Sequence, residues 1–186
     1  LPYVYKSIER GLSEFSPDYV VAASATNQHC ADLKKIQTHG FKGKLLIEKP
    51  LWGRPFEEPK SSTKDAFVGY NLRYHPVIQN LNRLVKHADI FSVHAYAGQY
   101  LPDWRPNRDY RDSYSAKKSE GGGVLRDLSH ELDYLQWILG RWNRVTALGG
   151  QLSSLEIDSE DNVVVLAEFE NCPAASLHLN YLDRRL

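Results

Sequence analysis

Apolar positions divide the first part of the chain into alternating helices and strands. Apolar residues at helical spacing predict a helix over residues 2–15, and the unbroken apolar run over residues 19–26 predicts a parallel strand buried on both faces. A helix over residues 28–39, capped by Asn27, and a short strand over residues 44–47 come next. Helix, strand, helix and strand in this order predict half of a doubly wound α/β sheet.

The later part of the chain has a different pattern. After a polar connection over residues 52–65, we expect a strand over residues 66–70 and a helix from Pro76, where we place the domain boundary. Strand patterns then recur at residues 91–96, 145–152, 162–169 and 174–182. They predict an α+β domain with a mostly antiparallel sheet, covered by a helix on one face and open on the other.

A glycine-led helix carries the first candidates for chemistry. Three glycines precede an apolar helical stripe formed by Leu125, Leu128, Leu132, Leu135 and Leu139. The opposite face carries Asp127, His130, Tyr134 and Trp137 and is expected to line a cleft. An imidazole and a carboxylate one turn apart suit proton exchange with a hydroxyl group. The alternative is that Asp127 caps the helix and His130 is an ordinary, partly buried histidine.

Two strand ends supply a second set of candidates. In doubly wound sheets, ligands bind beyond the carboxyl ends of the strands, which here are residues 24–29 and 48–51. Lys49, held extended because it precedes proline, can present an ammonium group to a hydroxyl or carboxamide. The alternative is a solvated turn lysine that pairs with Glu48.

Further candidate binding residues lie in two other stretches. Asn71 and Arg73 follow the strand expected over residues 66–70, at the same sheet edge as Lys49. The loop between Gln99 and Gly121 is long enough to be functional. Three of its side chains suit stacking on and hydrogen bonding to a sugar, namely Trp104, Arg105 and Tyr110. The alternative is that its aromatic side chains only anchor the loop as a cover.

Composition excludes several classes of protein. With 23 basic and 23 acidic residues among 186, the chain offers no electrostatic surface for nucleic acid or a membrane, and the arginines of the long loop alternate with aspartates. The spacing of Cys30 and Cys172 matches neither a disulfide scaffold nor a zinc site, so we expect no metal and a cytoplasmic location. The absence of methionine and the strand pattern at the end predict that the sequence is part of a longer chain.

Three motifs occur together in an order typical of one family. They are Ser-Ala-Thr-Asn-Gln-His at residues 24–29, Glu-Lys-Pro-Leu at residues 48–51, and the triple glycine followed by Asp127, His130 and Asp133. Together they resemble the Gfo/Idh/MocA family of nicotinamide-dependent oxidoreductases. Residues 69–76 also resemble the last nucleotide-domain strand of that family. The resemblance covers nearly the whole chain.

The resemblance implies a fold, a cofactor and a reaction. Residues 1–75 would be the C-terminal part of a Rossmann domain that binds NAD or NADP, and residues 76–186 a substrate domain that self-associates through its open sheet. Hydride would leave a sugar, nucleotide-sugar or cyclitol carbon while His130 or Lys49 takes the hydroxyl proton close to Asp127. The implied substrate-binding residues are Lys49, Trp104, Arg105, Tyr110, Asp127 and His130. The implied cofactor-binding residues are Ala25, Thr26, Asn27, His29, Glu48, Lys49, Pro50, Asn71 and Arg73.

The sequence departs from the family pattern in two places. Many members have Asp-x-x-x-His, whereas this chain has Asp127-x-x-His130, which leaves open whether His130 or Lys49 is the principal proton acceptor. The glycine-rich phosphate loop and the acidic ribose-binding residue, expected upstream, are not in this sequence. We therefore expect negligible dehydrogenase activity from these residues alone. Two alternative functions are a glycoside hydrolase that recycles bound NAD and a non-catalytic sensing or assembly protein.

Overall fold

The computed structural model describes residues 3–53 and 65–184 and divides into two compact units, Leu1–Gly69 and Tyr70–Leu186. Most of the predicted connection over residues 52–65 lies outside the described residues. The predicted domain limits at residues 75 and 76 concern where a nucleotide-binding domain ends, and they stay a prediction.

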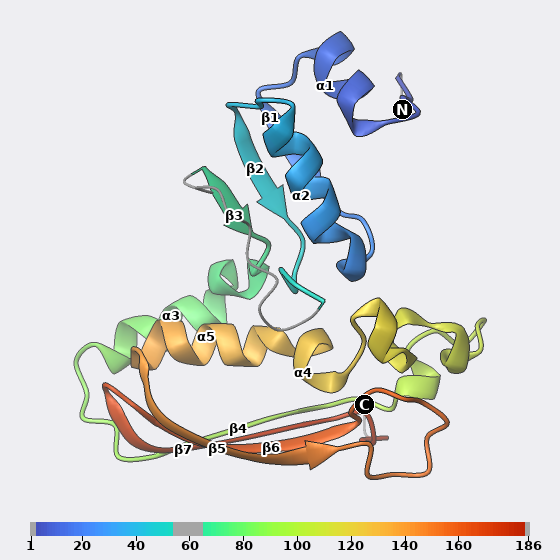
Figure 1. Ribbon diagram of the computed structural model, residues 1–186. Coiled ribbons are helices and arrows are strands. Elements are labelled where there is room, and N and C mark those ends of the chain that lie inside the picture. The colour runs from blue at the N-terminus through green and yellow to red at the C-terminus, as the bar shows by residue number, and fades with distance from the viewer. Residues whose placement is uncertain (1–2, 54–64, 185–186) are drawn as a thin grey trace. The chain divides into compact units, whose positions relative to one another are not determined.

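The first unit is built on a three-stranded parallel sheet in the order β1-β2-β3 (Figure 1). Its elements are α1 (Ile8–Phe15), β1 (Tyr19–Ala22), α2 (His29–Thr38), β2 (Lys44–Ile47) and β3 (Ala66–Val68). Leu33 and Ile36 of α2 form a buried core with Leu45 and Ile47 of β2. The predicted part of a doubly wound α/β sheet is confirmed.

Element ends in this unit differ from the sequence prediction for identifiable reasons. Helix α1 begins only at Ile8 because the Ser7 hydroxyl accepts a hydrogen bond from the Arg10 N–H and caps it. Strand β1 ends at Ala22, the last residue that pairs with β2. Its Tyr19 and Val21 side chains are 51% and 50% exposed, so the prediction of a strand buried on both faces is wrong.

The predicted cap of α2 is also wrong. A 3₁₀ turn over Thr26–Gln28 precedes the helix, and the Gln28 N–H donates to the Ala25 carbonyl oxygen at 2.8 Å. Asn27 therefore lies inside this turn, exposed, and makes no capping hydrogen bond.

The second unit is a four-stranded sheet in the order β4-β7-β6-β5, with helices on one face (Figure 1). Its main elements are α3 (Pro76–Val85), β4 (Val93–Gly98), α4 (Val124–Asp127), α5 (Ser129–Leu139), β5 (Trp142–Gly150), β6 (Asn162–Phe169) and β7 (Cys172–Asn180). Strand β6 pairs antiparallel with β5 and β7, whereas β4 pairs parallel with β7. The mostly antiparallel, open-faced sheet is confirmed.

The core of this unit lies between the helices and the sheet. Leu135 and Leu139 of α5 are buried with Val165, Leu177 and Leu179 of the sheet. The other three leucines of the predicted stripe, Leu125, Leu128 and Leu132, pack against this core and are partly buried.

Two predicted elements of the second unit are interrupted. The helix expected to run from residue 124 is split at Leu128, whose φ of −99° and ψ of 32° are not helical. Strand β7 ends at Asn180, because the Asn180 side chain accepts hydrogen bonds from the N–H groups of Leu182 and Asp183 and turns the chain. The strand predicted over residues 174–182 therefore ends two residues earlier than expected.

Candidate functional site

His29 connects the two predicted ligand loops of the first unit. Its side chain is 1% exposed, and its ring nitrogens Nδ1 and Nε2 each lie 3.0 Å from a carbonyl oxygen, of Pro50 and Ser24 respectively. These carbonyl groups belong to the turns after β2 and β1. His29, predicted to contact the cofactor, is thus a buried residue that ties the Lys49–Pro50 turn, which contains a cis peptide bond, to the turn after β1.

Other predicted cofactor-binding residues lie around this link. Ala25, Asn27 and Glu48 are exposed, Lys49 is half-buried, and Thr26 and Pro50 are buried. The Ser24 hydroxyl oxygen is buried and has no hydrogen-bond partner among the described residues. An unpaired buried hydroxyl is unusual in a folded protein, and a polar ligand at this edge of the sheet would supply the missing partner. The edge therefore offers a hydrogen-bonding position to a polar ligand, and the amide or ribose of a nicotinamide cofactor is one such ligand.

Asp127 is the best-anchored predicted catalytic residue in the second unit. Its carboxylate is 5% exposed and accepts a 2.7 Å hydrogen bond from the hydroxyl of Tyr181, which is fully buried. Tyr114 makes a second side-chain hydrogen bond to Asp127. Burial, followed by the negative charge of Asp127, raises the pKa of Tyr114 to about 12 and raises the pKa of Tyr181 above its usual range. Both phenols therefore stay protonated and act as donors.

His130 lies in the first turn of α5, just beyond the break at Leu128. It is half-buried, and its ring packs edge-on against Tyr70 with ring centroids 5.6 Å apart. The break means that Asp127 and His130 do not share one regular helix, whereas the prediction of a single polar face assumed an unbroken one. Of the two aromatic members of that face, Tyr134 packs against the core of the unit.

Arg73 has a carboxylate partner within the second unit. Its guanidinium group donates two hydrogen bonds to Asp133 of α5, through Nε at 2.7 Å and Nη2 at 2.5 Å, and lies 5.8 Å from the ring centroid of Trp137. Asn71, in the same 3₁₀ turn, is exposed. The predicted contact of Asn71 and Arg73 with a cofactor stays a prediction.

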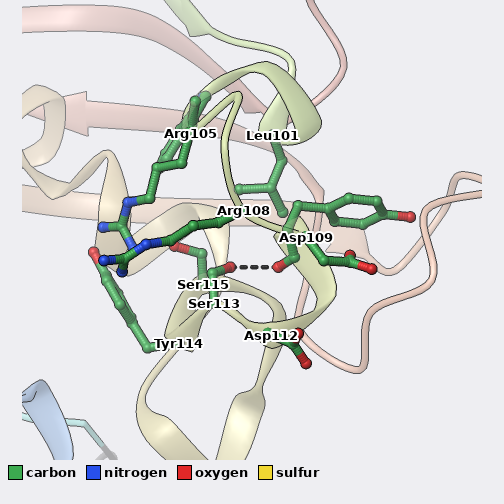
Figure 2. A pocket seen from close by; sticks show the side chains of 10 residues that line it. Leu101, Arg105, Arg108, Asp109, Asp112, Ser113, Tyr114 and Ser115 are labelled. Atoms are coloured by element: carbon green, nitrogen blue, oxygen red, sulfur yellow. Dashed lines mark hydrogen bonds between the residues drawn. The ribbon is translucent and has the colours of Figure 1, made fainter.

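The long loop folds into four 3₁₀ turns around a cavity of about 410 Å³ (Figure 2). All three predicted sugar-binding residues, Trp104, Arg105 and Tyr110, line it. Trp104 also packs edge-on against the buried Tyr181, with ring centroids 5.3 Å apart, so this residue anchors the loop to the core as well. The guanidinium carbon of Arg105 lies 5.7 Å from the ring centroid of Tyr114.

The triple glycine positions this loop. A Cβ atom on Gly122 would lie 2.2 Å from the carbonyl oxygen of Tyr114, and Gly123 has a φ of +121°. Only glycine allows the loop backbone to approach the start of α4 this closely. The motif thus brings Tyr114 to Asp127.

Sequence reasoning missed three residues of this region. Tyr181 follows the alternating pattern of the last strand, which indicates a core position but not a hydroxyl donor to Asp127. Tyr114 carried no signal other than its place in the long loop. Arg108, which also lines the cavity, was one of several arginines that alternate with aspartates.

The structure places the predicted catalytic residues in different units. Lys49 belongs to the first unit, and Asp127 and His130 belong to the second. Their joint action on one substrate stays a prediction. Over the described ranges, no group of three metal-ligating side chains gathers, and no helix is long and apolar enough to cross a membrane.

The fold resembles several solved structures. GenD2 from gentamicin A biosynthesis, solved with NAD, matches with a TM-score of 0.82 and 23% identity over 99% of this chain and 54% of that chain. The WlbA dehydrogenase from Bordetella pertussis, solved with NADH and UDP-GlcNAcA, matches with a TM-score of 0.79 and 20% identity over 97% and 53%. An oxidoreductase from Thermotoga maritima matches with a TM-score of 0.78 and 21% identity over 99% and 58%.

The present chain thus spans about half the length of these solved proteins. No curated protein matches the sequence. A family model does match: the GFO/IDH/MocA C-terminal domain covers residues 78–185, which is more than half of the chain. Together with the motifs of the sequence, this match establishes that the chain belongs to the Gfo/Idh/MocA family.

Proposed function

We propose that the complete protein is an oxidoreductase that moves a hydride between NAD or NADP and a hydroxyl-bearing carbon of a sugar, nucleotide sugar or cyclitol. The observation that carries the proposal is the buried Asp127 carboxylate, fixed by two tyrosine hydroxyls and three residues before His130 in the sequence. A fixed carboxylate close to an imidazole is suited to orienting a hydroxyl substrate and its proton acceptor. The solved relatives that carry NAD or NADH support the choice of cofactor.

Residues of both units take part in the proposed reaction. His130 or Lys49 takes the proton of the substrate hydroxyl, and the carbon–hydrogen bond gives up its electron pair as the carbonyl group forms. The nicotinamide ring, when bound, supplies the hydride acceptor. Ser24, Ala25 and Asn27 would hold the cofactor at the carboxyl edge of the parallel sheet. His29 would keep the Lys49 turn in place.

Turnover of the complete protein tests these roles. We expect the His130→Gln and Lys49→Met variants to lose activity, with the principal proton acceptor losing about 100-fold or more in kcat. The same variant should lose the pH dependence of kcat. His87→Gln, at an exposed position after α3, is the matched control. Full turnover in both variants would contradict the proposal, and so would glycosidic cleavage that needs no His130 or Lys49.

We also propose that the open sheet face binds a second copy of the chain in a reducing, cytoplasmic compartment. This face carries exposed apolar side chains, including Leu148, Val164 and Leu166, which are 77%, 38% and 57% exposed. Both cysteines are free thiols, which suits reducing conditions. Leu166→Glu should convert the oligomer to a smaller species in size-exclusion chromatography, and an unchanged elution volume would count against this interface.

A further inference from the structure

The cavity in the long loop is lined by two arginines that are not paired with a carboxylate of the described residues. Arg105 and Arg108 both line it, and within the described part of the chain neither makes an ion pair or a side-chain hydrogen bond. Other arginines of this unit do have carboxylate partners: Arg73 pairs with Asp133, and Arg126 with Glu160. Arg83, Arg141 and Arg184 of this unit make no ion pair among the described residues either, so what distinguishes Arg105 and Arg108 is that both line one cavity.

The carboxylates that line the same cavity do not balance the two arginines. Asp109 is engaged by Arg111, which contacts both of its carboxylate oxygens and also pairs with Glu156. In Figure 2, the guanidinium groups of Arg105 and Arg108 point to the side of the cavity where Tyr114 lies, whereas Asp109 and Asp112 lie on the other side. Two positive charges thus face one side of a cavity, and an anion bound there would be attracted by both.

We propose that Arg105 and Arg108 bind the phosphate group of a phosphorylated or nucleotide-linked sugar, an inference that rests on the proposed function and narrows its substrate class. Two guanidinium forks match the charge of a dianion, whereas a carboxylate carries only one negative charge. The cavity has the volume of an ordinary small-molecule site, about 410 Å³. Its Trp104, Tyr110 and Tyr114 provide aromatic walls for a sugar or base.

The cavity is connected to the predicted chemistry through one residue. Tyr114 lies under the Arg105 guanidinium group and hydrogen-bonds Asp127. The Tyr114 side chain therefore links Arg105, which would hold the phosphate, to the Asp127 carboxylate that we assign to the substrate hydroxyl. Neutral cyclitols and free sugars lack the group that this cavity recognises.

Calorimetric titration of the protein without nicotinamide tests the inference. The ligands are UDP, glucose 1-phosphate, inorganic phosphate and uridine, at low and high salt. We expect UDP and glucose 1-phosphate to bind, and Arg105→Gln and Arg108→Gln each to weaken them about tenfold, the loss of one charge-assisted contact. Arg83→Gln, an exposed arginine of α3, should leave binding unchanged, and Arg105→Lys should restore part of the loss.

The four ligands of the titration distinguish a nucleotide sugar from a sugar phosphate as the source of the bound phosphate group. Tighter binding of UDP than of glucose 1-phosphate assigns the site to a nucleotide sugar, and the reverse assigns it to a sugar phosphate. Inorganic phosphate or uridine binding as tightly as both would overturn the inference, and so would wild-type affinity in the double variant. Because both arginines are exposed, these substitutions should not unfold the protein, which a thermal melt verifies.

The two proposals can also fail separately. Arginine-dependent binding of UDP without any hydride transfer by the complete protein would refute the oxidoreductase proposal and keep the phosphate site. Oxidation of an unphosphorylated polyol, unchanged in the double arginine variant, would refute the phosphate site and keep the oxidoreductase proposal.

Discussion

Each unit contains a buried polar side chain among its predicted site residues, His29 in the first unit and Asp127 in the second. The two side chains are held in different ways. The His29 imidazole contacts two backbone carbonyl oxygens, from the turns after β1 and β2. The Asp127 carboxylate is held by two side chains, Tyr181 and Tyr114. Backbone contacts fix the path of two loops, whereas side-chain contacts fix the orientation of one charged group. The first unit therefore positions a turn, and the second positions a carboxylate.

Loss of the carboxylate should have the largest effect on stability. Asp127→Ala leaves the buried Tyr181 hydroxyl without its acceptor, and we expect the free energy of unfolding to fall by about 2 to 4 kcal/mol. Asp127→Asn keeps an acceptor and should lose less. Urea denaturation measures both, with the exposed Asp89→Ala as control. A smaller loss of unfolding free energy in Asp127→Ala than in Asp89→Ala would show that the buried tyrosines do not need Asp127 as a hydrogen-bond acceptor.

Loss of the imidazole should have a smaller and more local effect. His29→Ala removes two contacts to carbonyl oxygens, and we expect a loss of about 2 kcal/mol. Amide hydrogen exchange should speed up in residues 24–29 and 48–51 and stay unchanged in the second unit. His39→Ala, at an exposed position just after the same helix, is the control. Uniformly faster exchange in both units would contradict a local role.

The smallest expected effect concerns the second tyrosine. Tyr114→Phe should cost about 1 kcal/mol at neutral pH, since one hydrogen bond to Asp127 is lost. Because the folded protein raises the pKa of Tyr114 to about 12, its contribution is present below about pH 10 and lost as the pH rises toward that value. The ultraviolet titration of phenolate should therefore show one late-titrating tyrosine fewer in Tyr114→Phe than in the wild-type protein, while the buried Tyr181 still titrates late. An unchanged number of late-titrating tyrosines in Tyr114→Phe would contradict the raised pKa of Tyr114.

The sequence predicted the order of elements better than their ends. Strand β2 and helix α3 were predicted correctly because their boundaries coincide with strong local signals, such as Pro76. The end of β1 depends on where its partner strand stops, and the helix splits at Leu128 although leucine itself favours a helix. Neither is visible in a local pattern.

The candidate site shows the same limit. Residue type and motif order selected His29, Asp127 and Arg73 as candidates, but most contacts of these residues are with residues distant in sequence. Asp127 meets Tyr181 across 54 positions, and Arg73 meets Asp133 across 60. Contacts of this kind depend on packing, so the sequence could not predict that Asp127 is a buried acceptor.

One measurement tests the central claim most directly. The complete protein is mixed with NAD or NADP and with UDP-glucose, UDP-N-acetylglucosamine, glucose 6-phosphate or myo-inositol in turn, and the absorbance band of reduced nicotinamide is followed. The account predicts that the band grows with at least one phosphate-bearing sugar and is lost in the His130→Gln, Lys49→Met double variant. No reduction of either cofactor by any of these compounds, or undiminished reduction in the double variant, would contradict it.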